Sequence, residues 1–161
     1  PIETLVVSIE ASAVIPGISI GDGPVIRTGD AAYTFDAETE QVLVVASEIL
    51  KDRDSEFKVQ RQLMSGGVCE ATAFALNGYK TTGLAFPLGN YHNATTRIMD
   101  LDGGIDAEYI AISDFFGGVD LLAEAAMNVS RRHQSKVRRW IKEIDVPDEV
   151  RKRLVYTRDR Y

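Results

Sequence analysis

Short apolar segments alternate with segments of helical periodicity along most of the chain. Thr4–Glu10 is rich in β-branched residues and predicts a strand that ends at a carboxylate. Phe57–Met64 alternates apolar and polar residues, whereas Thr81–Pro87 is almost continuously apolar, as is typical of a central strand. Strands joined by helical crossovers predict an α/β fold, with three layers in the order α/β/α and a mostly parallel sheet.

The helical segments carry their own boundary signals. Ala37–Lys51 has apolar residues at helical spacing, and Asp36 before it predicts an N-cap. A short helix is expected over Cys69–Asn77, because a glycine-containing turn precedes it and Gly78 follows it. A longer helix is expected to begin after Ser113 and to end near Val129.

Two further features divide the chain. Gly21-Asp22-Gly23 between short apolar runs predicts a hairpin over Gly17–Gly29. Pro147 is expected to separate two helical pieces at the C-terminal end. We therefore expect an α/β unit over residues 1–130 and a basic helical tail, packed on it, over residues 131–161.

Charge is distributed unevenly between these two parts. Residues 131–161 hold 11 of the 18 Lys and Arg residues but only 5 of the 24 Asp and Glu residues, so their balance is +6 and that of the remainder is −12. A basic tail can indicate nucleic-acid binding. No aromatic platform or nucleic-acid motif accompanies this one, so a solvated helical tail lying on an acidic body is the preferred interpretation, and no nucleic-acid partner is expected.

The composition excludes some classes of protein. No apolar run approaches the ~20 residues of a membrane span, so no membrane partner is expected. The single cysteine, Cys69, rules out an internal disulfide framework, and with no signal-peptide core it favours a cytoplasmic location. A strand-like run begins almost directly after Pro1, and the chain is expected to be cut from a longer one.

Polar residues follow the predicted strands. In a parallel sheet, ligands bind beyond the carboxyl ends of the strands, where Glu10, His92 and the Gly66–Glu70 turn are expected to converge. His92 is a candidate metal ligand or general base, or simply a surface histidine, and Glu10 is a candidate ligand or a carboxylate that reaches solvent. Cys69 at a helix N-terminus is a candidate nucleophile with His92 as its base, although a buried cysteine is more commonly a small apolar residue.

Two segments resemble a known family. Met64-Ser65-Gly66-Gly67-Val68-Cys69-Glu70-Ala71-Thr72-Ala73 and Gly83-Leu84-Ala85-Phe86-Pro87-Leu88-Gly89-Asn90-Tyr91-His92-Asn93 resemble the co-catalytic zinc exopeptidases, in particular the glutamyl and deblocking aminopeptidases and their endoglucanase-like members. Ile20–Ile26 is similar to the hairpin that follows the strand-end acidic ligand of that family, and Ile110–Leu122 to its final catalytic-domain helix. The likeness covers about Thr4 to Val129, and it implies the C-terminal half of a zinc-peptidase catalytic domain.

The resemblance also implies roles for residues. His92 matches the last histidine ligand of one metal, and Glu10 matches the acidic ligand of the other, where many relatives have Asp. The implied cofactors are two divalent ions, zinc first, with cobalt or manganese as alternatives. The substrate-side loop would comprise Gly66, Gly67, Cys69, Glu70, Asn90 and Tyr91, with no catalytic step assigned to it.

The remaining ligands and the general base of that family are expected before Pro1. The isolated chain is therefore expected to be inactive, its partners being a peptide substrate and the missing N-terminal half; a homo-oligomer is compatible with the sequence. Two alternatives stay open. One is a Cys/His hydrolase that uses Cys69 and His92, and the other is a non-catalytic interaction module.

Overall fold

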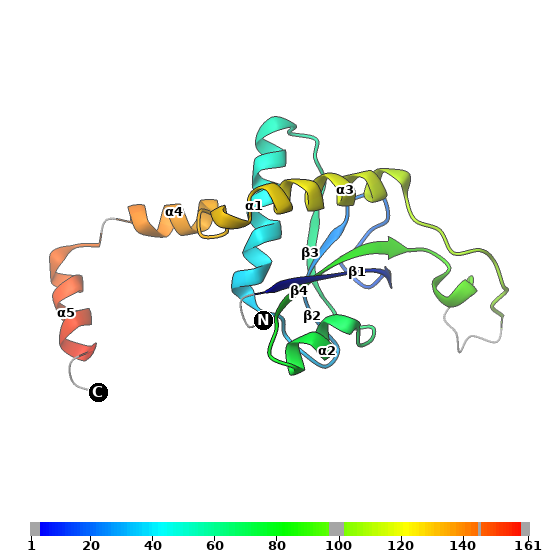
Figure 1. Cartoon of the computed structure of the whole chain (residues 1–161), viewed down its shortest axis with the longest axis horizontal. Coiled ribbons are helices and arrows are strands. Elements are labelled where there is room, and N and C mark those ends of the chain that lie inside the picture. The colour runs from blue at the N-terminus through cyan, green and yellow to red at the C-terminus, as the bar shows by residue number, and fades with distance from the viewer. Residues whose placement is uncertain (1–3, 97–101, 145, 159–161) are drawn as a thin grey trace.

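Four strands form a single mixed sheet in the computed structural model, which describes residues 4–96, 102–144 and 146–158 (Figure 1). The strands lie in the order β1-β4-β2-β3 and have the bounds β1 Leu5–Ala13, β2 Val25–Asp30, β3 Gln60–Met64 and β4 Lys80–Leu88. β1 pairs with β4 in parallel, and so does β2 with β3, whereas β2 runs antiparallel to β4. The predicted α/β class and mostly parallel sheet are confirmed, with one reversal between β4 and β2.

Helices cover both faces of this sheet. α1 (Ala37–Arg53) and α3 (Ile112–Met127) pack on one face, and α2 (Glu70–Leu76) packs on the other (Figure 1). Side chains alternate along the strands, so Ile26 of β2 and Leu84 of β4 meet α1 and α3 in the larger core, where they are almost completely buried.

The opposite face has a smaller core. Val25 and Ala85, which are the neighbours of Ile26 and Leu84 in sequence, pack there with Ile18 and Met64. The prediction that β4 is a central strand is confirmed, because it lies between β1 and β2 and is buried along most of its length.

The cap of α1 is formed as predicted. The Asp36 carboxylate accepts a hydrogen bond from the Thr39 backbone N–H at 2.7 Å, which satisfies one of the free donors of the first turn. α3 differs, because its N-cap is Ala111 and Ser113 lies within the helix. β3 is also shorter than predicted, since Phe57–Val59 lies outside the strand.

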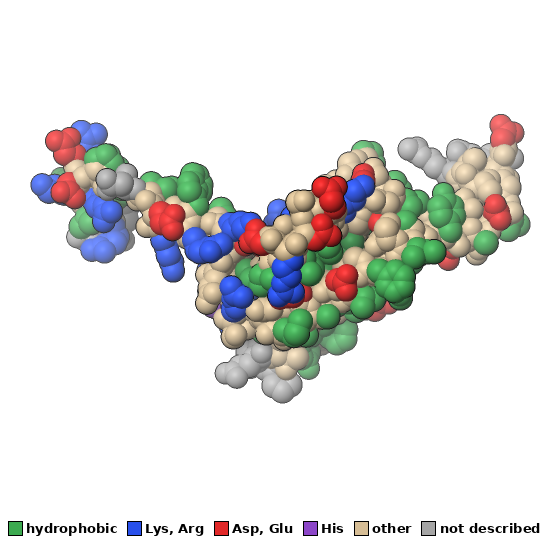
Figure 2. Space-filling view, turned by 90° about the horizontal axis from the view of Figure 1, so that it is seen from above, with side chains coloured by type: hydrophobic (Ala, Val, Ile, Leu, Met, Phe, Trp, Pro, Cys, Tyr) green, Lys and Arg blue, Asp and Glu red, His purple; other side chains and the backbone are tan. Residues whose placement is uncertain are grey.

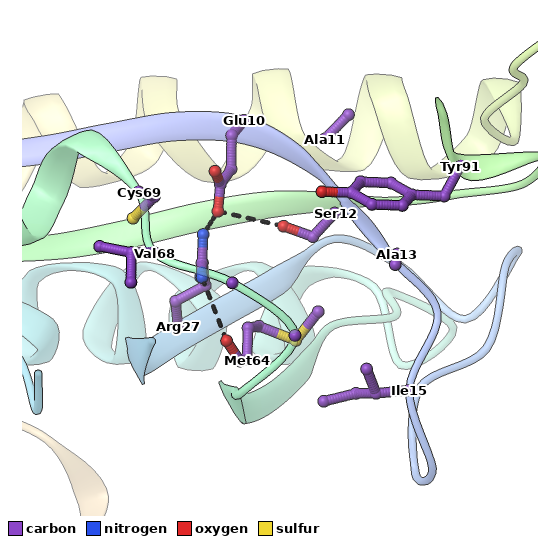
Figure 3. Close-up of a pocket in the computed structure, with 12 residues that line it drawn as sticks. Glu10, Ala11, Ser12, Ala13, Ile15, Arg27, Met64, Val68, Cys69 and Tyr91 are labelled. Atoms are coloured by element: carbon purple, nitrogen blue, oxygen red, sulfur yellow. Dashed lines mark hydrogen bonds and ion pairs between the residues drawn. The ribbon is translucent and has the colours of Figure 1, made fainter. Parts of the chain in front are cut away.

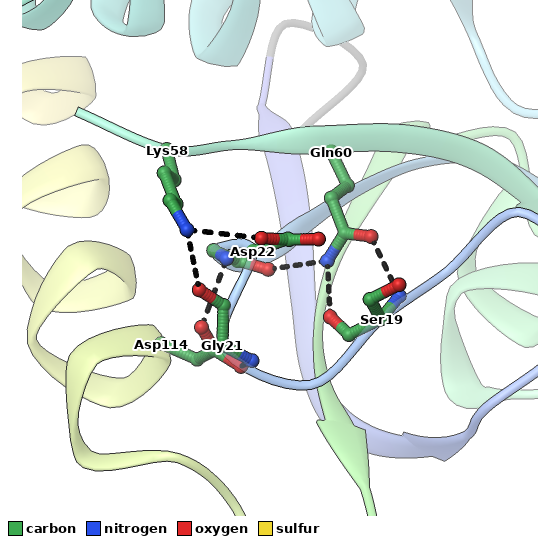
Figure 4. Close-up of polar contacts among 7 residues, drawn as sticks. Ser19, Gly21, Asp22, Lys58, Gln60 and Asp114 are labelled. Carbon is green, nitrogen blue, oxygen red and sulfur yellow. Dashed lines mark hydrogen bonds and ion pairs between the residues drawn. The ribbon is translucent and has the colours of Figure 1, made fainter. Parts of the chain in front are cut away.

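The predicted hairpin over Gly17–Gly29 is wrong. β2 has β3 on one side and β4 on the other, so it has no free edge for the segment before it. That segment is held by polar contacts instead (Figure 4). The Asp114 carboxylate accepts the backbone N–H groups of Gly21 and Gly23, each at 2.8 Å. The glycine turn is therefore real, but Asp114 of α3 and the side chains of Lys58 and Gln60 hold it, and it does not join two paired strands of a hairpin.

The C-terminal helices extend away from the sheet (Figure 1). A short 3₁₀ helix, η2 (Val129–Arg131), leads into α4 (Lys136–Glu143) and α5 (Asp148–Arg158). Lys136 pairs with Asp52 at 2.6 Å and Arg138 with Glu38 at 2.8 Å, so the first part of the basic tail contacts the acidic surface of α1. Lys and Arg side chains are prominent over this tail (Figure 2). No helix in the described ranges has the length and apolar character needed to cross a membrane.

Candidate functional site

β1 and β4 are paired in parallel, so their C-terminal ends, near which Glu10 and His92 lie, are at the same end of the sheet. The two strands are parallel and in register from Leu5 opposite Lys80 to Ala13 opposite Leu88. His92 lies four residues beyond the end of β4. Glu10 is not at the end of β1 as predicted, because the strand continues to Ala13 and Glu10 lies opposite Ala85. Its side chain therefore lies over the α2 face of the sheet.

A pocket opens on this face beside Glu10 (Figure 3). Ser12 on the same strand donates its hydroxyl to the Glu10 carboxylate at 3.0 Å. The pocket is small, about 50 Å³, which is room for a few water-sized groups. It is lined by residues from β1 and the segment after it, from β2, from the end of β3 and the loop after it, and from the loop after β4: Glu10, Ala11, Ser12, Ala13, Ile15, Arg27, Met64, Gly66, Gly67, Val68, Cys69 and Tyr91.

The loop after β3 reaches this pocket by an indirect route. β3 runs opposite to β4, so the loop starts at the other edge of the sheet and folds back over the α2 face. Gly66, Gly67 and Cys69 thereby line the same pocket as Glu10. Glu70 and Asn90 lie outside its lining. Glu70 begins α2, and the Asn90 side chain donates to the Ala107 carbonyl at 2.8 Å.

Asp30 at the end of β2 fixes this loop. Its carboxylate accepts the Thr72 hydroxyl at 2.6 Å and the Cys69 backbone N–H at 3.0 Å. Two further backbone donors, from Ala32 and Tyr33, reach the other carboxylate oxygen. Burial alone would raise the pKa of Asp30, but the hydrogen bonds, led by that of Thr72, lower it to about 2. Asp30 is thus a charged anchor for the pocket wall.

His92 lies in a tightly curved loop beyond β4. It belongs to the short 3₁₀ helix η1 (Tyr91–Asn93), where its φ of 60° is in the left-handed region, as are the φ angles of Asn90 and Asn93. Its backbone N–H donates to the Glu108 carboxylate at 2.8 Å, and its ring contacts the Tyr91 ring with centroids 4.0 Å apart and the two planes tilted by 38°. His92 is exposed, and no hydrogen bond reaches its ring nitrogens from the described residues.

The Arg27 side chain was not identified from sequence. It is only 3% exposed, although it is an arginine in the middle of β2, and its guanidinium forms an ion pair with Glu10. A charged residue inside an otherwise apolar buried strand was the signal available in Val25-Ile26-Arg27.

The structure gives no hydrogen bond between Cys69 and His92 among the described residues, and it places His133 away from the pocket. Cys69 is half-buried and lines the pocket, but among the described residues no hydrogen bond joins its sulfur to His92. His133 lies in the tail, 3.7 Å from Glu38, and takes no part in the pocket.

A metal centre can be tested against the donors present. A carboxylate oxygen and a neutral imidazole nitrogen are both normal zinc ligands, and Glu10 and His92 lie toward one edge. Within the described part of the chain, no three His, Cys, Asp or Glu residues are grouped so that they could hold a metal ion. Glu10 and His92 are thus of the donor types that a divalent metal ion takes, but the described residues do not form a complete metal site by themselves.

No family model and no curated protein sequence matches the chain. Solved structures do match its fold. The Pyrococcus horikoshii TET1 peptidase aligns with a TM-score of 0.55 at 21% identity over 76% of this chain. The aminopeptidase APDkam598 of Desulfurococcus kamchatkensis gives 0.54 at 21% over 74%, and the TET aminopeptidase of Thaumarchaeota archaeon SCGC AB-539-E09 gives 0.51 at 17% over 74%.

The chain shares its fold with TET aminopeptidases. It spans about a third of each of these solved chains, namely 32% for the first two and 31% for the third. The fold supports a resemblance to peptidases, and at such identities it says nothing further about chemistry.

Proposed function

We propose that this chain is the C-terminal half of the catalytic domain of a dinuclear zinc aminopeptidase, which removes N-terminal residues from peptides. The observation that carries the proposal is the parallel pairing of β1 with β4, because it brings the C-terminal ends of the strands that carry Glu10 and precede His92 to the same end of the sheet. The fold of this sheet and its helices is shared with TET aminopeptidases. His92 would bind one metal and Glu10 the other. Zinc is the preferred ion, with cobalt or manganese as alternatives.

The residues of this chain have distinct parts in such a site. Bound divalent ions would polarise the scissile carbonyl and lower the pKa of a water molecule. His92 offers unpaired ring nitrogens on a loop fixed by Glu108 and Tyr91. The Gly66–Cys69 segment forms a wall beside Glu10, on the side where a peptide would approach, and Asp30 holds that wall in place.

The proposal includes dependence on other polypeptide segments. A catalytic zinc normally has three protein ligands and a water, and this chain would give each metal one ligand. The general base would also come from the missing N-terminal half. The Pyrococcus horikoshii TET1 peptidase is described as assembling into a tetrahedron or an octahedral shell, and a homo-oligomer is part of the proposal here.

Zinc titration by calorimetry, with aminoacyl chromogenic substrates as a second assay, tests the proposal. We expect weak zinc binding that is lost in His92→Ala and kept in His133→Ala, which is a matched control because it removes the other histidine of the chain. We expect no peptide turnover with added zinc or cobalt. Zinc binding that survives His92→Ala would overturn the assignment of His92, and turnover that depends on His92 would overturn the half-domain assignment.

A further inference from the structure

Arg27 reaches Glu10 across the strand that lies between them. β4 separates β1 from β2, and Gly83 of β4 lies opposite Arg27. A Cβ atom at Gly83 would be 3.3 Å from both the Cβ and the Cδ of Arg27, so the arginine stem passes directly over this glycine. The side chain can cross β4 because that position carries no side chain of its own (Figure 3).

The buried guanidinium has two partners among the described residues, and its Nε has no hydrogen-bond partner there. It pairs with the Glu10 carboxylate through Nη1, and Nη2 donates to the Met64 carbonyl at 3.4 Å. The residue is 3% exposed, so water reaches only a small part of it. An arginine stays protonated at all ordinary pH values, so its positive charge is permanent.

The charges of the pocket therefore cancel. Glu10 is the only acidic residue and Arg27 the only basic residue among those that line it. A divalent cation that approaches Glu10 meets one negative and one positive charge at similar distance. In a partly buried site the repulsion from the buried arginine is not screened away by water.

We propose that Arg27 is a positioning residue that acts as an internal counter-cation and competes with a metal ion for the Glu10 carboxylate. The inference rests on the proposed function, because it takes Glu10 to be a metal ligand. It has a specific consequence: in this chain alone the Glu10 carboxylate binds a metal ion more weakly than it would without Arg27, and carboxylates from outside this chain would strengthen that binding by supplying further negative charge. The metal on the His92 side has no such competitor, because no lysine or arginine forms an ion pair or hydrogen bond with His92 among the described residues.

Site-resolved NMR of the full chain during a zinc titration tests the competition. The side-chain ¹³Cδ resonance of Glu10, assigned with Glu10→Gln, reports zinc at the carboxylate, and the His92 ring nitrogens report the other site. In Arg27→Met, half-saturation at Glu10 should require at least tenfold less zinc than in wild type. His92 should respond equally in both proteins. Arg27→Lys keeps the charge and should behave like wild type.

Arg61→Met is the matched control for loss of an arginine–glutamate pair. Arg61 of β3 pairs with Glu40 of α1 outside the pocket, so its removal should leave the Glu10 response unchanged. If Arg27→Met does not fold, Arg27→Gln removes the charge and keeps a polar side chain. A measurement without substitution is the Arg27 Nε resonance, which should shift as zinc occupies Glu10 in wild type.

The outcomes separate the two proposals. Equal zinc response of Glu10 in wild type and in a folded, uncharged Arg27 variant would overturn the role of Arg27 alone. So would a Glu10 resonance that shifts with zinc while the Arg27 Nε resonance does not. No response of either Glu10 or His92 in any variant would end the metal assignment and this inference with it.

Discussion

The Thr72 hydroxyl donates to the Asp30 carboxylate at 2.6 Å and so joins the first turn of helix α2 to the end of strand β2. Asp30 also receives the Cys69 backbone N–H, and the Ala31 N–H donates to the Gly67 carbonyl at 3.0 Å. The Gly66–Cys69 wall of the pocket is thus held to the end of β2 by the Asp30 carboxylate and the Ala31 backbone N–H.

Acid should loosen this attachment. The pKa of Asp30 is lowered from 3.8 to about 2, so the native state holds this proton less readily than the unfolded chain does. The corresponding stability is present above about pH 4 and is lost as the pH falls from about 4 to 2. Its size is at most about 2 kcal/mol. Urea unfolding of wild type and Asp30→Asn at pH 7 and pH 2.5 should show a stability difference that shrinks at the lower pH. A difference independent of pH would contradict the charged anchor.

Asp114→Asn should destabilise the fold by about 1–3 kcal/mol, since a buried carboxylate that receives two backbone donors is replaced by a neutral amide. Asp120→Asn is the control, because Asp120 lies on the same helix and is exposed. Thermal unfolding of both variants gives the comparison. Equal melting temperatures would show that Asp114 does not hold the Gly21–Gly23 turn.

Gly89→Ala should disturb the His92 loop. Gly89 and Tyr109 exchange backbone hydrogen bonds, and a Cβ at Gly89 would overlap the Tyr109 ring. We expect zinc binding through His92 to weaken severalfold, as measured by calorimetry. Gly104→Ala, whose Cβ would make an ordinary contact with the Thr95 hydroxyl at 3.4 Å, should leave zinc binding unchanged.

Ile9→Lys should reduce self-association of the isolated chain. β1 is an edge strand of nine residues, and the Ile9 side chain is 52% exposed beside it. Charged side chains on an edge strand oppose pairing with another chain. Light scattering across a concentration series should show a smaller mean mass for the variant, with an unchanged melting temperature. Identical masses would mean that the β1 edge does not associate.

The sequence predicted well those elements whose formation depends on residues close together along the chain. The Asp36 cap of α1 and the apolar run of β4 needed only a few neighbours along the chain. The hairpin failed because partner choice for β2 is a long-range property, and Val25 pairs with Gln60 and Ala85. The position of Glu10 inside β1 shows the same limit, because only the pairing with β4 extends the strand to Ala13.

Two residues of the candidate site, Glu10 and His92, were selected from the sequence, but the arginine that neutralises Glu10 was not. Glu10 and His92 could be selected by residue type and position, but nothing near Arg27 in sequence shows that it crosses Gly83 to reach Glu10. That contact depends on the strand order, which places β4 between the two. The roles of Glu10 and His92 as metal ligands stay predictions.

The left-handed backbone at Asn90, His92 and Asn93 limits which amino acids this loop can accept. Asparagine and glycine tolerate positive φ, whereas most other side chains are strained there. The string Gly89-Asn90-Tyr91-His92-Asn93 therefore encodes a backbone shape as well as a possible ligand. A protein found to share these letters should first be compared for the path of its main chain, and only then for its metal. In a mutational library of this segment, His92→Asn or His92→Gly would remove the imidazole while keeping the loop, which separates chemistry from shape.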